Sequence, residues 1–254
     1  MKETHFFDDD IYPRYNAHAN VHQHSLKEYE QYFAHHTSEK RVMEATPIYL
    51  YQETAVAQFS AFAEKPKVLF VLREPAQRAY SQFRFNKYRL GNIEQNLPYE
   101  QYLGQMANSK GDPLARGHYI QFLDKWVAGL GTGNVYAIQS EKLFPNRVEE
   151  MKKIALFLDI DPDFYDQFDF MKRNETLKMR STKLHRLGLK VQPSVPQFIQ
   201  EKVLIPLYLK LNATAMPPVS KVDKNLVQSQ KDLFQESNER LTKSFPNIDL
   251  NLWK

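Results

Sequence analysis

The sequence contains no cysteine, so disulfide bonds and thiolate metal sites are excluded. No apolar run approaches the roughly 20 residues that a helix needs to cross a bilayer. The first ten residues, MKETHFFDDD, are polar and end in acidic residues, unlike a signal peptide. Internal repeats and low-complexity segments are also absent. These absences predict a soluble, cytoplasmic protein without a membrane span.

Strong charge of either sign is also lacking. The formal net charge of the 254 residues is +4, with 42% hydrophobic and 25% charged residues, which is ordinary for a globular protein. A mildly basic chain favours a polyanionic ligand, but no aromatic and basic platform for nucleic acid is visible. Four histidines, His18, His22, His24 and His36, have a spacing that fits no convergent metal set. We therefore expect neither a metal nor a nucleic-acid partner.

Strand and helix patterns alternate through the middle of the chain. Val68–Leu72 is a short apolar run between charged flanks, typical of a fully buried strand, and Pro75–Phe85 continues at helical spacing. An amphipathic helix from Tyr119 to the glycines near Gly129, a second apolar strand at Val135–Ile138 and a helix at Val148–Leu158 repeat the order. This alternation predicts an α/β fold, with a central parallel β-sheet flanked by helices.

Weaker patterns predict the remaining elements. The two phenylalanines near the N-terminus are expected to fray, because chain ends are seldom held. The helix at the C-terminal end should turn Leu226, Leu233 and Leu241 inward. The other predicted elements are helices at Lys27–His36, Ile48–Tyr51 continuing through Ala55–Phe62, Tyr99–Met106, Val195–Leu211 and Lys221–Lys243, a short strand at Arg41–Pro47, and a docked end at Asp249–Trp253.

The junction Arg73-Glu74-Pro75 lies where the first strand ends and a helix begins. Ligands of open α/β sheets bind beyond the carboxyl ends of the strands, and helix N-termini favour anions. An arginine at that corner can bind a phosphate with two parallel bonds, and Ser81 follows two helical turns later. The junction predicts an anion or phosphate site, with a surface arginine at a strand–helix junction as the open alternative.

Seven fragments then occur in one order along the chain. The ordered set resembles the sulfotransferase family that uses 3′-phosphoadenosine-5′-phosphosulfate (PAPS), and it is most similar to the bacterial and heparan-sulfate-type branch. The resemblance implies a single sulfotransferase domain over residues 1–254, with a fold related to that of P-loop nucleotide kinases. The fragments are KETHFF at Lys2–Phe7, EATPIYL at Glu44–Leu50, VLFVLREPAQRAYSQF at Val68–Phe83, RGHYIQFLDKW at Arg116–Trp126, VYAIQSEKL at Val135–Leu143, FLDI at Phe157–Ile160 and ESNERL…W at Glu236–Trp253.

The resemblance assigns roles in catalysis and in donor binding. Glu3 would be the general base for an acceptor hydroxyl, with His5 beside it as a supporting or positioning group. Arg73 and Ser81 would hold the 3′-phosphate of PAPS. Tyr119 matches a position near the donor, with a core tyrosine as the open alternative.

Further roles concern the acceptor and a late loop. Glu44 matches an acidic position of the family's E-x-TP turn, and Ala45 stands where heparan-type members often have lysine. Glu44 and Arg84 are the expected acceptor contacts. Within a basic stretch from Lys172 to Arg186, the expected donor contacts are Lys178, Arg180 and Ser181, and a solvated basic loop is the open alternative.

One family element has no counterpart in the printed sequence. The resemblance places an N-terminal strand, a Gly/Lys/Thr-rich loop and a helix for the 5′-phosphosulfate upstream of Glu3. Neither Gly129–Gly133 nor Arg186–Lys190 qualifies as such a phosphate-binding loop. We therefore expect an N-terminally incomplete domain, and a truncated reading, a degenerate gene and a partner chain that supplies the loop stay open.

The function that the resemblance implies is transfer of a sulfonate group from PAPS to a hydroxyl or amine of a carbohydrate or small metabolite. A catalytically impaired, sulfotransferase-like protein that binds nucleotide or glycan is the alternative. A P-loop kinase is disfavoured, because the chain has no Gly-x4-Gly-Lys-Ser/Thr motif. The acceptor and the oligomeric state, including a homo-oligomer, stay open.

Overall fold

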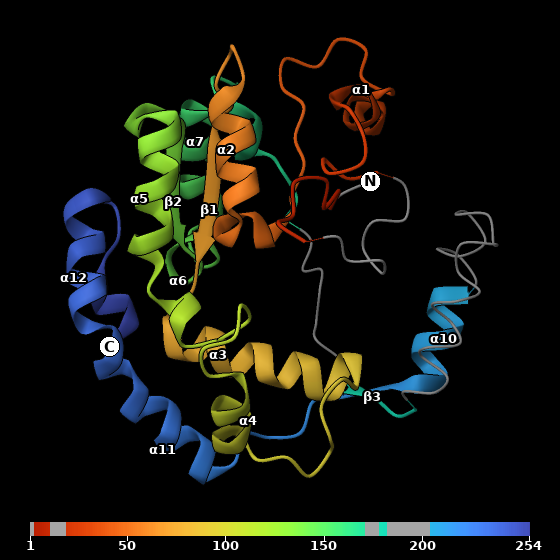
Figure 1. Ribbon diagram of the computed structural model, residues 1–254, viewed down its shortest axis with the longest axis vertical. Coiled ribbons are helices and arrows are strands. Elements are labelled where there is room, and N and C mark those ends of the chain that lie inside the picture. The colour runs from red at the N-terminus through yellow and green to blue at the C-terminus, as the bar shows by residue number, and fades with distance from the viewer. Residues whose placement is uncertain (1–2, 11–18, 171–177, 182–203) are drawn as a thin grey trace. The chain divides into compact units, whose positions relative to one another are not determined.

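The computed structural model of the chain describes residues 3–10, 19–170, 178–181 and 204–254 (Figure 1). The chain divides into two compact units, each with its own hydrophobic core. The first unit comprises Met1–Glu74, His118–Phe170 and Gln235–Lys254, and the second comprises Pro75–Gly117 and Met171–Phe234. The single domain over residues 1–254 stays a prediction. None of the described helices is long and apolar enough to span a membrane.

The first unit is built on two parallel strands, β1 (Val68–Leu72) and β2 (Val135–Gln139), which pair in register from Val68↔Val135 to Leu72↔Gln139. The predicted α/β fold with a parallel sheet is confirmed, and β1 has the predicted bounds. Burial of β1 is less complete than predicted, because Val71 is 48% exposed while Leu72 is 2% exposed. Within the described residues β1 has a single neighbouring strand, so one of its edges carries no ladder.

Helices cover both faces of this pair (Figure 1). On one face Trp126, from α5 (Tyr119–Leu130), lies between two aromatic rings, with ring centroids 5.4 Å from Phe70 of β1 and 5.7 Å from Phe59 of α2 (Glu53–Ala61). On the other face Tyr136 of β2 packs on Phe157 of α7 (Arg147–Phe157), 5.2 Å between ring centroids. Parallel strands are usually covered in this way on both faces.

Helices α2 and α5 approach closely at Gly129. A Cβ atom at this position would lie 2.0 Å from Oγ and 3.2 Å from Cβ of Ser60, so a larger residue would have to displace the Ser60 side chain. Two residues later Gly131 has a φ of +86°, a left-handed conformation that ends α5 before the chain enters β2. Gly129 and Gly131 therefore serve helix packing and helix termination, respectively.

The N-terminal segment is part of the core, and the expectation that it frays is wrong. Phe6 and Phe7 are fully buried. The ring of Phe7 lies 4.7 Å from Tyr29, 6.0 Å from Tyr49 and 4.9 Å from Phe59, measured between ring centroids. This aromatic packing supplies the burial that a chain end normally lacks.

Short elements complete the first unit, where η denotes 3₁₀- and π-helical turns. The predicted helix at residues 48–62 divides at Gln52, which is extended and accepts a hydrogen bond from the Asp9 backbone N–H at 2.6 Å. The predicted strand at Arg41–Pro47 is wrong, because none of the strands in the described part of the chain pairs with it. The Arg41 side chain instead donates to the Leu158 carbonyl at 2.9 Å. The short elements are α1 (Leu26–Glu30), η1 (Gln31–Phe33), η2 (Pro47–Tyr51), η5 (Thr132–Asn134), α6 (Ser140–Leu143), η6 (Asp163–Asp166), α12 (Gln235–Ser244) and η10 (Leu250–Trp253).

The second unit is helical around an aromatic core. Helix α3 (Pro75–Arg84) passes directly into the π-helical η3 (Phe85–Leu90). Tyr80 and Phe83 of α3 pack on Tyr99 of α4 (Tyr99–Met106), with ring centroids 4.9 and 5.2 Å apart. The other elements are η4 (Ala115–Gly117), β3 (Lys178–Met179), α10 (Ile205–Asn212), β4 (Ala213–Thr214), α11 (Lys221–Gln230) and η9 (Lys231–Phe234), with β3 and β4 antiparallel.

The predicted helix at Lys221–Lys243 is interrupted. The tighter turn η9 separates α11 from α12 and shifts the phase of the side chains. Leu241 is buried as predicted, but Leu233 is 56% exposed and Phe234 is fully buried in its place. Of the predicted helix at Val195–Leu211, residues 195–203 lie outside the described residues.

Candidate active site

Glu3, His5 and Asp8 lie together in the N-terminal segment. Nδ1 of His5 is 2.9 Å from Oδ2 of Asp8, and Nε2 of His5 is 3.7 Å from Oε2 of Glu3. Side-chain exposure rises along this series, from 1% for Asp8 and 9% for His5 to 46% for Glu3. A histidine thus connects a buried carboxylate with a solvent-accessible one, a geometry in which the accessible carboxylate can accept a proton from a ligand.

The carboxylate of Asp8 favours the protonated, positively charged form of the His5 ring. Burial lowers the pKa of His5, but the hydrogen bond and charge of Asp8, together with the weaker effect of Glu3, outweigh it and raise the pKa above its usual value. Oδ1 of Asp8 is buried without a hydrogen bond within the described residues. The imidazolium of His5 is therefore the main compensation for a buried carboxylate charge.

Asp8 was missed by the sequence reasoning, which singled out Glu3 and His5 alone. The available signal was a carboxylate three residues after a histidine within one turn. His22 supports the same turn, because its Nε2 lies 2.8 Å from the backbone oxygen of Asp8. This contact gives one of the scattered histidines a structural role.

Glu44, a predicted acceptor contact, is engaged within the chain. Its Oε2 accepts hydrogen bonds from the hydroxyls of Thr4 and Thr46, each at 2.7 Å, and its Oε1 accepts one from the Tyr29 hydroxyl at 2.8 Å. Burial, followed by the charge of Glu44, raises the pKa of Tyr29 far above its usual value, which keeps this hydroxyl a neutral donor. Contact of Glu44 with an acceptor stays a prediction.

Arg73 follows the last residue of β1 and is exposed. Its backbone oxygen accepts a hydrogen bond from the Tyr119 hydroxyl at 2.9 Å, and Tyr119 is only 2% exposed. No hydrogen bond or ion pair to the Arg73 guanidinium is present within the described residues. The arginine is thus fixed through its backbone, while its cationic group is left available to a ligand. Contact of Tyr119 with a donor stays a prediction.

The turn after β1 is held by Glu141, which the sequence reasoning did not single out. Oε1 of Glu141 accepts from the Glu74 backbone N–H at 3.0 Å, and Oε2 accepts from the indole of Trp253 at 3.1 Å. The carboxylate therefore connects the β1 turn, the end of β2 and the C-terminal segment. Its position in the fragment VYAIQSEKL was the only signal in the sequence.

The other predicted residues belong to the second unit. Ser81 is half-buried on α3. Arg84 donates to the Pro217 carbonyl, and its guanidinium lies 5.8 Å from the ring centre of Tyr80 and 5.9 Å from that of Tyr88. These contacts hold Arg84 by cation–π packing. Its predicted contact with an acceptor, like the phosphate contact of Ser81, stays a prediction.

Lys178, Arg180 and Ser181 lie at β3. The Arg180 backbone N–H donates to the Asn212 carbonyl at 2.8 Å, and Ser181 exchanges two backbone hydrogen bonds with the Asn212 side chain, at 2.7 and 3.0 Å. The Arg180 side chain is exposed. Other members of the basic stretch, namely Lys172, Arg173, Lys183 and Arg186, lie outside the described residues. Donor contacts here stay predictions.

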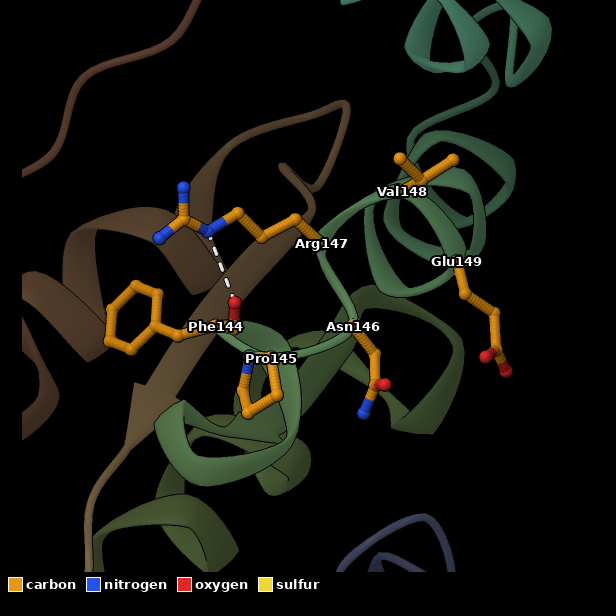
Figure 2. Close-up of a pocket in the computed structure, with 6 residues that line it drawn as sticks. All are labelled: Phe144, Pro145, Asn146, Arg147, Val148 and Glu149. Carbon is orange, nitrogen blue, oxygen red and sulfur yellow. Dashed lines mark hydrogen bonds between the residues drawn. The ribbon is translucent and has the colours of Figure 1, made fainter. Parts of the chain in front are cut away.

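Figure 2 shows a surface hollow of about 510 Å³ that contains none of the predicted site residues. The Arg147 side chain turns back to donate from Nε to the Phe144 carbonyl at 3.1 Å, while Glu149 points away (Figure 2). Because six consecutive residues line an open hollow, it offers no convergent chemistry. Across the described residues no group of three or more potential ligands could hold a metal ion. The lining residues are Phe144, Pro145, Asn146, Arg147, Val148 and Glu149.

Comparison with known proteins identifies the fold and the family. The crystal structure of a sulfotransferase from Alicyclobacillus acidocaldarius superposes with a TM-score of 0.54 at 20% identity, over 77% of this chain and 80% of that one. The fold is therefore that of a sulfotransferase. Residues 8–197 match the family model described as sulfotransferase domain. The chain thus belongs to the sulfotransferase domain family, as the sequence fragments predicted.

Two curated relatives lie in the heparan sulfate branch. Mouse heparan sulfate glucosamine 3-O-sulfotransferase 3B1 is 26% identical over 155 residues, which is 58% of this chain and 39% of the relative. The bifunctional heparan sulfate N-deacetylase/N-sulfotransferase 1 of Caenorhabditis briggsae is 25% identical over 154 residues, 56% of this chain and 18% of the relative. The chain thus aligns with less than half the length of either relative.

Proposed function

We propose that this protein transfers a sulfonate group from PAPS to a hydroxyl or amine of a saccharide acceptor. The observation that carries the proposal is the array of Glu3, His5 and Asp8 in a member of the sulfotransferase family. The relatives are named for sulfation of heparan sulfate, which supports a saccharide rather than a small metabolite as acceptor.

In the proposed step the acceptor oxygen or nitrogen forms a bond to the sulfur of PAPS. The bond from sulfur to the 5′-phosphate oxygen breaks, and its electron pair leaves with 3′-phosphoadenosine-5′-phosphate (PAP). Glu3 takes the acceptor proton, which becomes acidic as the bond to sulfur forms. The 46% exposure of the Glu3 side chain is consistent with access to a large acceptor.

His5 and Asp8 support this base. Asp8 holds the His5 ring through Nδ1 at 2.9 Å, which directs Nε2 toward the Glu3 carboxylate at 3.7 Å. Nε2 of His5 thus lies beside the carboxylate that accepts the proton from the acceptor. Because the buried member of the array is Asp8, acceptor contact is confined to Glu3 and the outer edge of His5.

The exposed guanidinium of Arg73 fits a phosphate, and we assign it to the 3′-phosphate of PAPS together with the Ser81 hydroxyl. Both assignments rest on the strand–helix motif of the family and on the absence of a competing partner for Arg73 within the described residues. Tyr119 supports Arg73 by donating a hydrogen bond to its backbone oxygen. Lys178, Arg180 and Ser181 are further proposed donor contacts, and Glu44 and Arg84 the proposed acceptor contacts carried over from the family.

The test is transfer of radiolabelled sulfonate from PAPS to a saccharide panel that includes glucosamine-containing oligosaccharides, with the protein at its full natural length. We expect label on a saccharide and a rise in thermal stability when PAP is added. PAP binding without transfer to any acceptor would favour a nucleotide-binding protein without catalysis. The absence of both transfer and a PAP-dependent shift would overturn the proposal. A cytoplasmic location and the lack of a nucleic-acid partner are further proposals from the sequence alone, and the oligomeric state, including a homo-oligomer, stays open.

A further inference from the structure

A hydroxyl of Thr46 holds the backbone that carries the candidate base. Oγ1 of Thr46 accepts hydrogen bonds from the backbone N–H groups of Thr4 at 3.0 Å and His5 at 3.4 Å. The same hydroxyl donates to Oε2 of Glu44 at 2.7 Å. Since a hydroxyl has one hydrogen and two acceptor lone pairs, the carboxylate fixes the direction in which Thr46 accepts. Glu44 lies 40 positions, and Thr46 lies 42 positions, from Thr4 in the sequence.

The backbone at His5 needs such support. Its φ of +52° lies in the left-handed region, which a residue other than glycine adopts only at an energetic cost. Residues in this region persist when the surrounding structure over-determines them. Glu3 and Asp8 flank the strained residue, so its backbone direction decides whether the His5 ring reaches both carboxylates.

Glu44 also binds Thr4 directly. Tyr29 and Tyr49 are the remaining members of this hydrogen-bonded cluster, Tyr29 through Glu44 and Tyr49 through Thr4. The Thr4 hydroxyl donates to Oε2 of Glu44 at 2.7 Å and lies 3.0 Å from the Tyr49 hydroxyl, which in turn accepts from the Phe7 backbone N–H at 3.1 Å. Burial raises the pKa of Tyr49 well above its usual range, and the charge of Glu44 adds to the shift, so the hydroxyl stays neutral. Thr4 is 1% exposed and Thr46 is 7% exposed.

We propose that Glu44 and Thr46 are positioning residues, which set the backbone of the Thr4–His5 turn and thereby hold Glu3 and His5 in their catalytic arrangement. This inference rests on the proposed function for its kinetic consequence. It differs from the acceptor contact that the family resemblance assigns to Glu44, because both carboxylate oxygens already accept hydrogen bonds from Thr4, Thr46 and Tyr29.

The kinetic test compares Thr46→Val, which keeps the shape but removes the hydroxyl, with Thr46→Ser, which restores it. We expect Thr46→Val to lower kcat by about tenfold to a hundredfold, the effect of a small misplacement of a catalytic group. The KM for the acceptor should stay within about twofold, because no binding contact is removed. Thr46→Ser should recover most of kcat. Glu44→Gln should lower kcat in the same way, and the exposed Glu53→Gln should leave both constants unchanged.

A measurement that needs no turnover is the NMR titration of the His5 ring with hydrogen exchange of the Thr4 and His5 amides. We expect Thr46→Val to bring the pKa of His5 closer to its ordinary value and to speed exchange of both amides. Unchanged titration and exchange would overturn the inference, as would a raised KM with kcat intact in Glu44→Gln. If the wild-type protein transfers no sulfonate, the proposed function fails, while the NMR result still decides the positioning role.

Discussion

The N-terminal turn (Glu3–Asp8) and the β1 junction (Arg73–Glu74) both belong to the first unit, but they hold their functional groups in opposite ways. In the N-terminal turn His5 contacts Asp8 at 2.9 Å, and the backbone N–H groups of Thr4 and His5 are bound by Thr46, whose hydroxyl Glu44 orients. At the β1 junction the backbone of Arg73 is fixed by Tyr119, while its guanidinium has no partner within the described residues. One region is complete without a ligand, and the other presents an unpaired cation.

The difference fits two chemical tasks. A general base works best when its geometry exists before the substrate arrives, because ordering it during the reaction would add to the barrier. An anion ligand works best when its charge is not neutralised by the protein, because a competing ion pair would have to break. We therefore expect mutations in the N-terminal turn to lower kcat, and mutation of Arg73 to weaken binding of the donor.

The largest expected effect is that of Glu3→Gln. Removal of the base should lower kcat by roughly 10²–10⁴-fold, the usual contribution of a general base. Thermal stability should stay unchanged, because the Glu3 side chain is 46% exposed and contacts His5 only at 3.7 Å. Initial rates and a thermal unfolding curve measure the two quantities. Near-normal kcat would remove Glu3 from the mechanism.

A smaller effect is expected for Arg73→Ala, which removes the unpaired cation. Loss of a charge-assisted contact of about 1.5–3 kcal/mol should weaken PAP binding by roughly tenfold to a hundredfold. The free energy of unfolding should change by less than about 0.5 kcal/mol, because the guanidinium has no partner within the described residues to lose. Calorimetric titration with PAP gives the affinity, and Arg240→Ala, an exposed arginine paired with Asp124, is the matched control. Equal affinities for the two variants would remove Arg73 from the donor site.

Local patterns predicted the elements that depend on neighbouring residues. The bounds of β1 and α4 followed from apolar runs and flanking breakers, and the helix after Pro75 followed from helical spacing. The interruption at η9 did not, because the 231–234 turn that buries Phe234 instead of Leu233 is decided by packing rather than by periodicity. The strand pattern at residues 41–47 failed for the same reason, since a strand needs a partner that its own sequence does not specify.

In the candidate site, too, the sequence predicted local features but not contacts between residues far apart in the chain. Glu3 and His5 came from a family fragment, but the support beneath them depends on hydrogen bonds between residues about 40 apart in the chain. Glu44 in particular occupies a motif position that predicts acceptor contact. In the structure its carboxylate accepts hydrogen bonds from three hydroxyl groups. Spacing alone does not reveal which neighbours saturate a side chain.

The smallest expected effect tests the completeness of the N-terminal turn through Asp8→Asn. The raised pKa of His5 means that its protonation contributes stability below the ordinary value of 6.5, and that this contribution is lost as pH rises through the higher folded-state pKa. Removing the Asp8 charge should lower the free energy of unfolding by roughly 1–2 kcal/mol near pH 6, and by less at a pH well above the folded-state pKa of His5, where its ring is neutral in both proteins. Urea unfolding at the two pH values measures the difference, with Asp124→Asn at a surface ion pair as control. A loss of stability independent of pH would show that Asp8 acts through packing rather than through the charge of His5, and that backbone contacts such as those to Thr46 hold the turn without that charge.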